Sequence, residues 1–204
     1  TTIIGMKMGL TSRAKMEQMG VDTPIYGFLA DYFERAESGE IAVEELIHPK
    51  VEAEIAFVTK SPLSGPGCTA AQVIAATDFI MPAVEVIDSR YENFRFDLVS
   101  VIADNASSSR FFTGGQVLEP MATDMRTIGV VLEKNGQVME VGASAAVLGN
   151  PATAIAMLAN QLAERDESIP AGSIILSGAI TAAIPVESGD NVTLRAHGMG
   201  SVSM

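Results

Sequence analysis

Residues 51–58 limit how this chain can fold more than any other stretch, because they predict a strand that carries acids in an apolar run. They read Val-Glu-Ala-Glu-Ile-Ala-Phe-Val. Side chains alternate across a strand, so Glu52 and Glu54 share a face with Ala56 and Val58, and the other face is wholly apolar. A strand that is largely apolar on both faces is usually covered on both sides. Two carboxylates in such a strand need protonation or a counter-ion.

A second predicted strand, residues 80–89, repeats this pattern. It reads Ile-Met-Pro-Ala-Val-Glu-Val-Ile-Asp-Ser, and it places Glu85 on an apolar face with Ala83 and Ile87. Three carboxylates from two neighbouring strands would suit a hard cation that takes oxygen ligands, Mg²⁺ or Mn²⁺. The sequence favours zinc less, because its softer ligands lie far apart and lack ligand spacing; they are Cys68, His48 and His197.

The same acids have a simpler interpretation as ordinary ion pairs. Lys50 and Arg90 flank the two predicted strands and could neutralise Glu52 and Glu54. The spacing alone leaves both interpretations open.

Charge and composition exclude several classes of partner. The net charge is −12 with only 13 Lys and Arg, which argues against nucleic acid and against anionic lipid. A small anionic substrate stays compatible, because a bound cation and a local lysine can reverse the field in a cleft. No long apolar run predicts a membrane span, and no signal peptide is recognisable. A single cysteine, Cys68, excludes an internal disulfide, and we expect a cytoplasmic location.

The remaining pattern predicts an α+β domain with a strongly bent sheet around a cleft. Residues 22–28 read as a loop, and residues 30–45 as an acidic, irregular segment. Asn135-Gly136 predicts a hairpin turn. Further elements are expected as helices over residues 11–19, 69–77 and 150–165, and as strands over residues 127–133, 137–142, 173–177, 183–186 and 191–196.

Two further features have a functional and a simple interpretation. Lys7 lies between Gly5 and Gly9, where it either contacts substrate or extends its head group to solvent. Residues 104–110, Asp-Asn-Ala-Ser-Ser-Ser-Arg, are rich in short polar side chains, which suits either a chain turn or the polar floor of a site.

Taken together, five motifs resemble the fumarylacetoacetate hydrolase superfamily, and within it the decarboxylase and hydratase families of catechol meta-cleavage. The motifs are Gly-Met-Lys-Met-Gly-Leu-Thr-Ser, Pro-Lys-Val-Glu-Ala-Glu-Ile-Ala-Phe, Pro-Ala-Val-Glu-Val-Ile-Asp-Ser-Arg, Ala-Asp-Asn-Ala-Ser-Ser and Leu-Ser-Gly-Ala. The resemblance implies a mixed, strongly bent β-roll with short flanking helices. It also implies an N-terminal helical segment that is missing here, and we expect residues 1–204 to form a single catalytic domain.

The resemblance further implies the site residues. Glu52, Glu54 and Glu85 would be the ligands of Mg²⁺ or Mn²⁺, and Lys7 would be the catalytic residue. We expect substrate contacts from four other residues, Ile25, Arg90, Ser107 and Thr181.

The implied reaction is decarboxylation of 2-oxohex-3-enedioate to 2-hydroxypenta-2,4-dienoate and CO₂. The alternative is hydration of 2-hydroxypenta-2,4-dienoate to 4-hydroxy-2-oxopentanoate. Hydratase relatives tend to hold an aspartate where this chain has Ile25 in Thr-Pro-Ile-Tyr-Gly, which favours the decarboxylase. A hydrolase acting on acylpyruvates would need a His-Glu pair, and neither His48 nor His197 stands next to a suitable acid.

A second alternative, from another functional class, is a metal-binding partner subunit without activity of its own. The retained Lys7 and the three glutamates argue against it. The expected partners are a small dicarboxylate keto acid, further copies of the chain in a homo-oligomer, and the hydratase of the same pathway.

Overall fold

The computed structural model describes the backbone of residues 1–204 and every side chain except those of Lys15 and Gln18. The strands are β1 (Ile3–Gly9), β2 (Ile25–Ala30), β3 (Glu34–Arg35), β4 (Lys50–Thr59), β5 (Thr77–Ile87), β6 (Ser108–Thr113), β7 (Gly129–Lys134), β8 (Gln137–Ala143), β9 (Ile174–Leu176), β10 (Ile184–Pro185), β11 (Val192–Ala196) and β12 (Gly200–Ser203). The helices are α1 (Arg13–Met19), α2 (Ala70–Ala76), α3 (Leu98–Ala103) and α4 (Pro151–Ala163).

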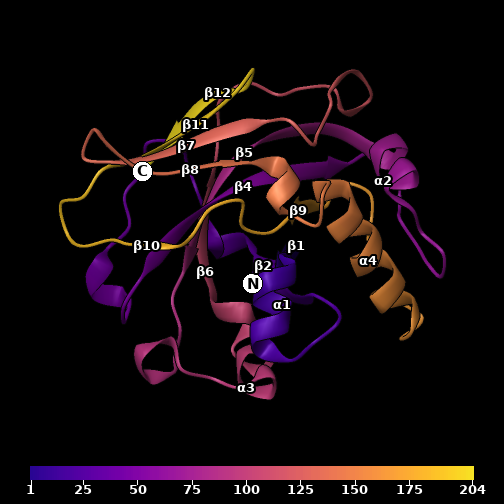
Figure 1. Cartoon of the computed structure of the whole chain (residues 1–204), viewed down its shortest axis with the longest axis horizontal. Coiled ribbons are helices and arrows are strands. Elements are labelled where there is room, and N and C mark those ends of the chain that lie inside the picture. Colours follow the sequence, from indigo (N-terminus) through magenta and orange to yellow (C-terminus); the bar gives the residue numbers. More distant parts are fainter.

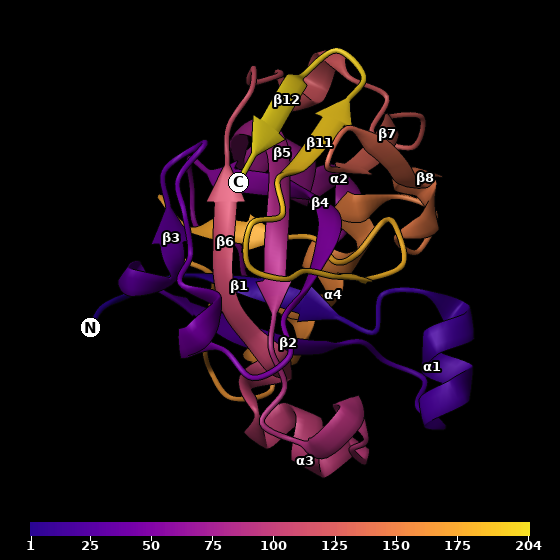
Figure 2. The ribbon, with the colours of Figure 1, turned by 90° about the vertical axis from the view of Figure 1, so that its left-hand side faces the viewer.

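The strands form two sheets. The larger has the order β2-β1-β9-β4-β5-β6-β3, with β10 also paired to β4, and the smaller has the order β12-β11-β7-β8. The larger sheet is mixed, because β1 runs parallel to β9 and β3 parallel to β6. In Figure 1 the small sheet lies across the top, with α2 and α4 at the right. The large sheet curls so strongly that β1 runs nearly across β5 and β6 in Figure 2. The expected α+β fold with a bent sheet is therefore confirmed.

Both faces of the central strand β4 are covered, as its apolar pattern predicted. One face contributes Ile55 and Phe57 to the main core, together with Leu132 and Leu194 of the small sheet and Leu158 of α4. All five side chains are fully buried. The other face carries Ala56 into a smaller apolar cluster. Its buried members are Leu29, Ala56, Ala83, Phe111 and Leu176.

Several local signals specify the elements as expected. Thr69 caps α2 through a reciprocal capping box with Gln72, and the Asn150 side chain caps α4 just before Pro151. Asn135 and Gly136 both have left-handed backbone angles, which the tight turn between β7 and β8 requires.

The predicted loop over residues 22–28 is wrong, because Ile25–Ala30 forms β2 and pairs with β1. Gly27 within β2 permits a close approach: a Cβ there would lie 2.6 Å from the carbonyl oxygen of Asn105. The pattern also did not predict β12, α3, or the continuation of the serine-rich stretch into β6.

None of the helices, over the residues whose structure is described, is long and apolar enough to cross a membrane.

Candidate metal centre and active site

The three predicted glutamates meet on one face of the large sheet. Glu52 on β4 lies directly opposite Glu85 on β5, and Glu54 follows two residues along the same face of β4. Each residue offers a carboxylate oxygen within 4.8 Å of those of the other two. Glu54 and Glu85 are fully buried, and Glu52 is 7% exposed. Three carboxylates are therefore held together out of water.

Burial and mutual repulsion shift the acidity of this cluster. Burial, together with the charge of Glu85, raises the pKa of Glu54 well above its ordinary value. Burial likewise raises the pKa of Glu85, although the ammonium group of Lys7 opposes the shift. The deprotonated cluster is therefore unfavourable without a cation.

The cluster also retains unused ligand atoms. The backbone N–H of Gly178 donates to Glu54 Oε2 at 2.7 Å, but Glu54 Oε1 is buried and has no hydrogen-bond partner among the described side chains and backbone groups. Glu85 Oε1 is in the same state. Buried acceptors without donors are unfavourable, and a cation would satisfy them. An all-carboxylate donor set fits a hard divalent cation such as Mg²⁺ or Mn²⁺.

Lys7 lies on the face that carries the glutamates. In β1 it pairs with Leu176 of β9, which in turn pairs with Ala56 of β4, two residues beyond Glu54. Lys7 Nζ lies 3.0 Å from Glu85 Oε2 and donates to the carbonyl oxygen of Ala106 at 3.1 Å. The side chain is 4% exposed, so its head group does not extend to solvent.

The charge of Lys7 is stabilised in place. Burial alone would lower the pKa of Lys7, but the negative charges of Glu85, Glu54 and Glu52 outweigh burial and raise it above its ordinary value. Lys7 is therefore a fixed ammonium group beside the carboxylates. Its catalytic role stays a prediction.

Gly178, which the sequence did not single out, supplies a backbone donor to Glu54. Its φ of +108° suits only glycine, and a Cβ there would lie 2.1 Å from Thr11 Oγ1. The available signal was the motif Leu-Ser-Gly-Ala, which places this glycine two residues after the end of β9.

Two of the predicted substrate-contacting residues lie close to the strand and loop that hold the glutamates and Lys7. Thr181 is buried, and its hydroxyl accepts a long, 3.4 Å hydrogen bond from the backbone N–H of Ala53. Ile25 packs in a small buried cluster with Val101 and Ala106, so it lies beside the residue whose carbonyl binds Lys7.

Ser107 belongs to a strained loop, residues 104–107. Asn105, Ala106 and Ser107 have φ values of +53°, +53° and +59°, which non-glycine residues rarely adopt. Ser107 Oγ donates to Asp104 Oδ2 at 3.4 Å. Substrate contact by Ser107, Thr181 or Ile25 stays a prediction.

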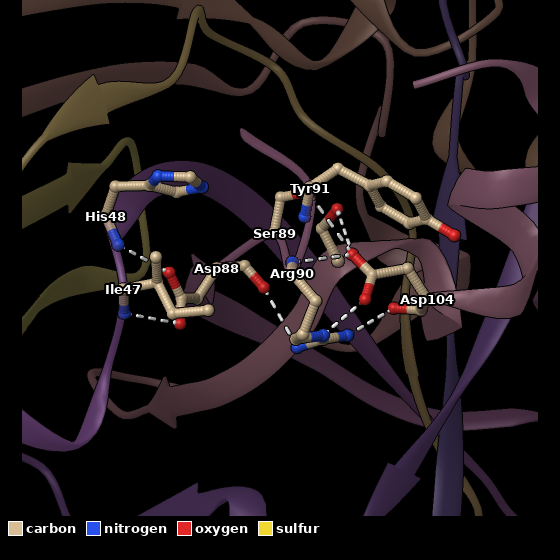
Figure 3. A network of polar contacts seen from close by, with 8 residues as sticks. Ile47, His48, Asp88, Ser89, Arg90, Tyr91 and Asp104 are labelled. Atoms are coloured by element: carbon tan, nitrogen blue, oxygen red, sulfur yellow. Dashed lines mark hydrogen bonds and ion pairs between the residues drawn. The ribbon is translucent and has the colours of Figure 1, made fainter. Parts of the chain in front are cut away.

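Lys50 and Arg90, the proposed ion-pair partners in the simpler interpretation, make other contacts. Lys50 Nζ lies 4.3 Å from the ring centre of Phe94. Arg90 forms an ion pair with Asp104 and donates to the carbonyl oxygen of Asp88 at 2.9 Å (Figure 3). Neither side chain accounts for the charge of Glu54 or Glu85. The role of Arg90 as a substrate contact stays a prediction.

Comparison with known proteins places this geometry in a family. Residues 27–204 match the family model described as fumarylacetoacetate (FAA) hydrolase C-terminal. Over 201 residues the chain is 66% identical to a 4-oxalocrotonate decarboxylase of Pseudomonas sp. strain CF600, an alignment that covers 98% of this chain and 76% of that protein. It is 37% identical over 204 residues to a 2-hydroxyhexa-2,4-dienoate hydratase of Comamonas testosteroni, covering 99% of this chain and 77% of that protein.

A solved structure shows the same fold at high identity. It is 4-oxalocrotonate decarboxylase from Pseudomonas putida G7, complexed with magnesium and adipate. It is 64% identical to this chain, with a TM-score of 0.97, and the match covers 99% of this chain and 77% of that one. The chain therefore belongs to the fumarylacetoacetate hydrolase family.

Proposed function

We propose that this chain is a divalent-metal-dependent decarboxylase that converts 2-oxohex-3-enedioate (4-oxalocrotonate) to 2-hydroxypenta-2,4-dienoate and CO₂ in meta-cleavage of aromatic compounds. The observation that carries the proposal is the buried cluster of Glu52, Glu54 and Glu85 with Lys7 beside it. It occurs in a chain 66% identical to a decarboxylase of this substrate. The adipate in the relative from Pseudomonas putida G7 is, like the proposed substrate, a six-carbon dicarboxylate.

In this proposal the three glutamates hold Mg²⁺ or Mn²⁺. When bound, the cation supplies a Lewis acid that stabilises negative charge on the ketone oxygen of the substrate. In the reaction the C5–C6 bond breaks, C6 leaves as CO₂, and the electron pair moves through the conjugated carbons to the C2 oxygen. One proton on that oxygen completes the dienol.

Lys7 is the residue placed to supply that proton. Its ammonium group lies 3.0 Å from Glu85 Oε2 and donates to the Ala106 carbonyl oxygen at 3.1 Å, which fixes its position beside the glutamates. A fixed donor contributes by position as well as by acidity. The proton passes from Lys7 Nζ to the C2 oxygen.

The apolar surroundings favour loss of the carboxylate. The face that carries the glutamates continues into the buried cluster around Ala56, Ala83 and Phe111, which excludes water. Ile25 adds an apolar side chain beside Ala106. A poorly solvated carboxylate gives up less hydration free energy when it becomes neutral CO₂, so its loss is easier.

The proposal includes substrate contacts by Ser107 and Thr181, and it treats residues 1–204 as one catalytic domain. It also includes a cytoplasmic location, which the single cysteine supports, and assembly into a homo-oligomer or with the pathway hydratase. These parts are supported by the family motifs rather than by a contact in the structure.

Hydration of 2-hydroxypenta-2,4-dienoate is the second candidate, because the same family contains hydratases such as the one from Comamonas testosteroni. A hydratase must protonate one carbon and deliver water to another, which calls for an additional acid or base. Ile25 sits instead among apolar neighbours, Val101 and Ala106. This observation and the higher identity to decarboxylases favour decarboxylation.

The test is incubation of the purified chain with 2-oxohex-3-enedioate and Mg²⁺, following CO₂ release and the ultraviolet signal of the dienol together. We expect prompt CO₂ and dienol accumulation. Consumption of supplied 2-hydroxypenta-2,4-dienoate without CO₂ release would show a hydratase instead. Inactivity in both assays would favour a partner subunit without activity. A glutamate outside the cluster provides the control for substitutions within it. Glu133→Gln removes an acid that pairs with Arg195 on the small sheet, and it should leave turnover unchanged.

A further inference from the structure

A second polar network lies at the end of β5, just beyond Glu85, and its centre is Asp104 (Figure 3). The Asp104 carboxylate forms an ion pair with Arg90 Nε and accepts from the Arg90 backbone N–H at 3.2 Å. It also accepts from the hydroxyls of Ser89 at 3.3 Å and Ser107 at 3.4 Å. Its side chain is only 4% exposed. Asp104 is the first residue of the loop that follows α3. Its carboxylate therefore connects this loop to the chain that leaves β5.

The loop it binds is the strained 104–107 loop. Three consecutive non-glycine residues in the left-handed region are unfavourable by about 1–2 kcal/mol each, so the surrounding structure must stabilise them. Asn105 contributes by bonding both backbone groups of Phe28, as acceptor at 2.8 Å and as donor at 3.0 Å. The backbone N–H of Asp88 donates to the Ser107 carbonyl oxygen at 2.8 Å. The Asp104 carboxylate supplies the only charged contact among these.

The strained conformation has a clear structural consequence: it directs the carbonyl oxygen of Ala106 toward Lys7 Nζ, at 3.1 Å. An ordinary turn at this position would not need to present a carbonyl to a buried ammonium group. The contacts thus run from Arg90 through Asp104 and the Ala106 carbonyl to Lys7, and Lys7 in turn contacts Glu85.

We propose that Asp104 is a positioning residue for the decarboxylation, which holds the 104–107 loop so that Ala106 fixes Lys7, and that Arg90 acts through Asp104. The inference rests on the proposed function, because it assigns Lys7 as the proton donor. It gives Arg90 a role other than substrate contact. Half-exposed Arg90 already has its guanidinium group on Asp104 and on the Asp88 carbonyl oxygen.

The experiment begins with Asp104→Asn, which keeps the size of the side chain and one acceptor but removes the charge. The matched control is Asp124→Asn, which breaks another Asp-Arg pair, with Arg126, on an exposed turn away from the loop. Four quantities are measured: kcat and KM with Mg²⁺ saturating, Mg²⁺ affinity by calorimetry, and the acylation rate of Lys7 relative to exposed Lys60 by mass spectrometry. Thermal unfolding shows that each variant is folded at the assay temperature.

For Asp104→Asn we expect kcat to fall by about 10- to 100-fold, because a misplaced catalytic group loses activity steeply with distance. KM should change less than kcat, because among the proposed substrate contacts only Ser107 lies in this loop. Mg²⁺ affinity should be unchanged, whereas Lys7 acylation should become faster relative to Lys60. The control should change none of these. An unchanged kcat and acylation ratio, or a loss of Mg²⁺ affinity parallel to that of kcat, would overturn the proposal.

Arg90→Gln and the double variant separate the two roles of Arg90. If Arg90 acts through Asp104, the two substitutions are non-additive in kcat, and the double variant resembles Asp104→Asn alone. If Arg90 contacts substrate directly, KM rises in Arg90→Gln and the effects add, which contradicts the proposal. The acylation ratio needs no substrate. Failure of the proposed function, with no CO₂ from the wild type, therefore stays distinguishable from failure of this inference.

Discussion

The two faces of the β4–β5 strand pair are both buried, but one carries apolar side chains and the other carries carboxylates. One face contributes Ile55, Phe57 and Val84 to the main core, where each side chain is fully buried among apolar neighbours. The other face presents Glu54 and Glu85, also fully buried, with acceptor oxygens that lack donors. The first face stabilises the fold. The second is unfavourable until a cation binds, and it therefore marks the site of function.

The largest expected effect is on the acidic face. Glu54→Gln should lower Mg²⁺-dependent turnover by more than about 100-fold, because even residues that only orient metal ligands contribute 10- to 100-fold. The purified variant is assayed for CO₂ release over a range of Mg²⁺ concentrations. Full activity at moderate Mg²⁺ would mean that Glu54 is not a ligand.

On the core face, the expected effect is on stability instead. Phe57→Ala should lower the free energy of unfolding by about 3–5 kcal/mol, since it removes a fully buried aromatic ring and leaves a cavity. Denaturant unfolding of the metal-free chain measures the loss. A comparable loss in metal-free Glu54→Gln would abolish the contrast between the faces.

Mg²⁺ itself should stabilise the wild type. At about 100 times its dissociation constant, a ligand that binds only the folded state adds about 2.7 kcal/mol. Thermal unfolding with and without Mg²⁺ measures this gain, and Glu54→Gln should show little of it. Equal gains in both proteins would place the ion elsewhere.

The smallest expected effect is on the pH dependence of the metal-free chain. Burial raises the pKa of Glu54 above its ordinary value of 4.5, so the folded state holds this proton more tightly than the unfolded state. Stability linked to Glu54 is therefore present below that ordinary value and is lost as pH rises through the raised one.

Metal-free Glu54→Gln should consequently be more stable than wild type at about pH 8, by about 1–3 kcal/mol, the penalty of a buried group without partners. The difference should shrink as pH falls toward the ordinary carboxyl pKa. Denaturant unfolding at a series of pH values measures it. A stability difference between Glu54→Gln and wild type that grows as pH falls would contradict the predicted direction of this pH dependence.

The comparison of faces also shows how far the sequence alone predicts this protein. The acids at Glu52, Glu54 and Glu85 were recognisable because each interrupts an apolar strand pattern, which is a local signal. The hairpin at Asn135 and the cap at Asn150 are local signals of the same kind.

The parts that were not predicted depend on contacts distant in sequence. Residues 22–28 were predicted as a loop, but Gly27 lies in β2 against the Asn105 carbonyl. Gly178 donates to Glu54 from 124 residues away in sequence. Asp104 acts through a loop in which Ala106 and Ser107, residue types that disfavour the left-handed region, adopt it. Such roles arise only when the sheet curls and brings these segments together.

The most direct test of the account is anomalous diffraction near the manganese absorption edge, from crystals of the chain grown with Mn²⁺. We expect one strong peak between the carboxylates of Glu52, Glu54 and Glu85, with Lys7 beside it, and loss of that peak in Glu54→Gln. A peak elsewhere, with no ion among the three glutamates, would contradict the assignment of this face as the metal centre.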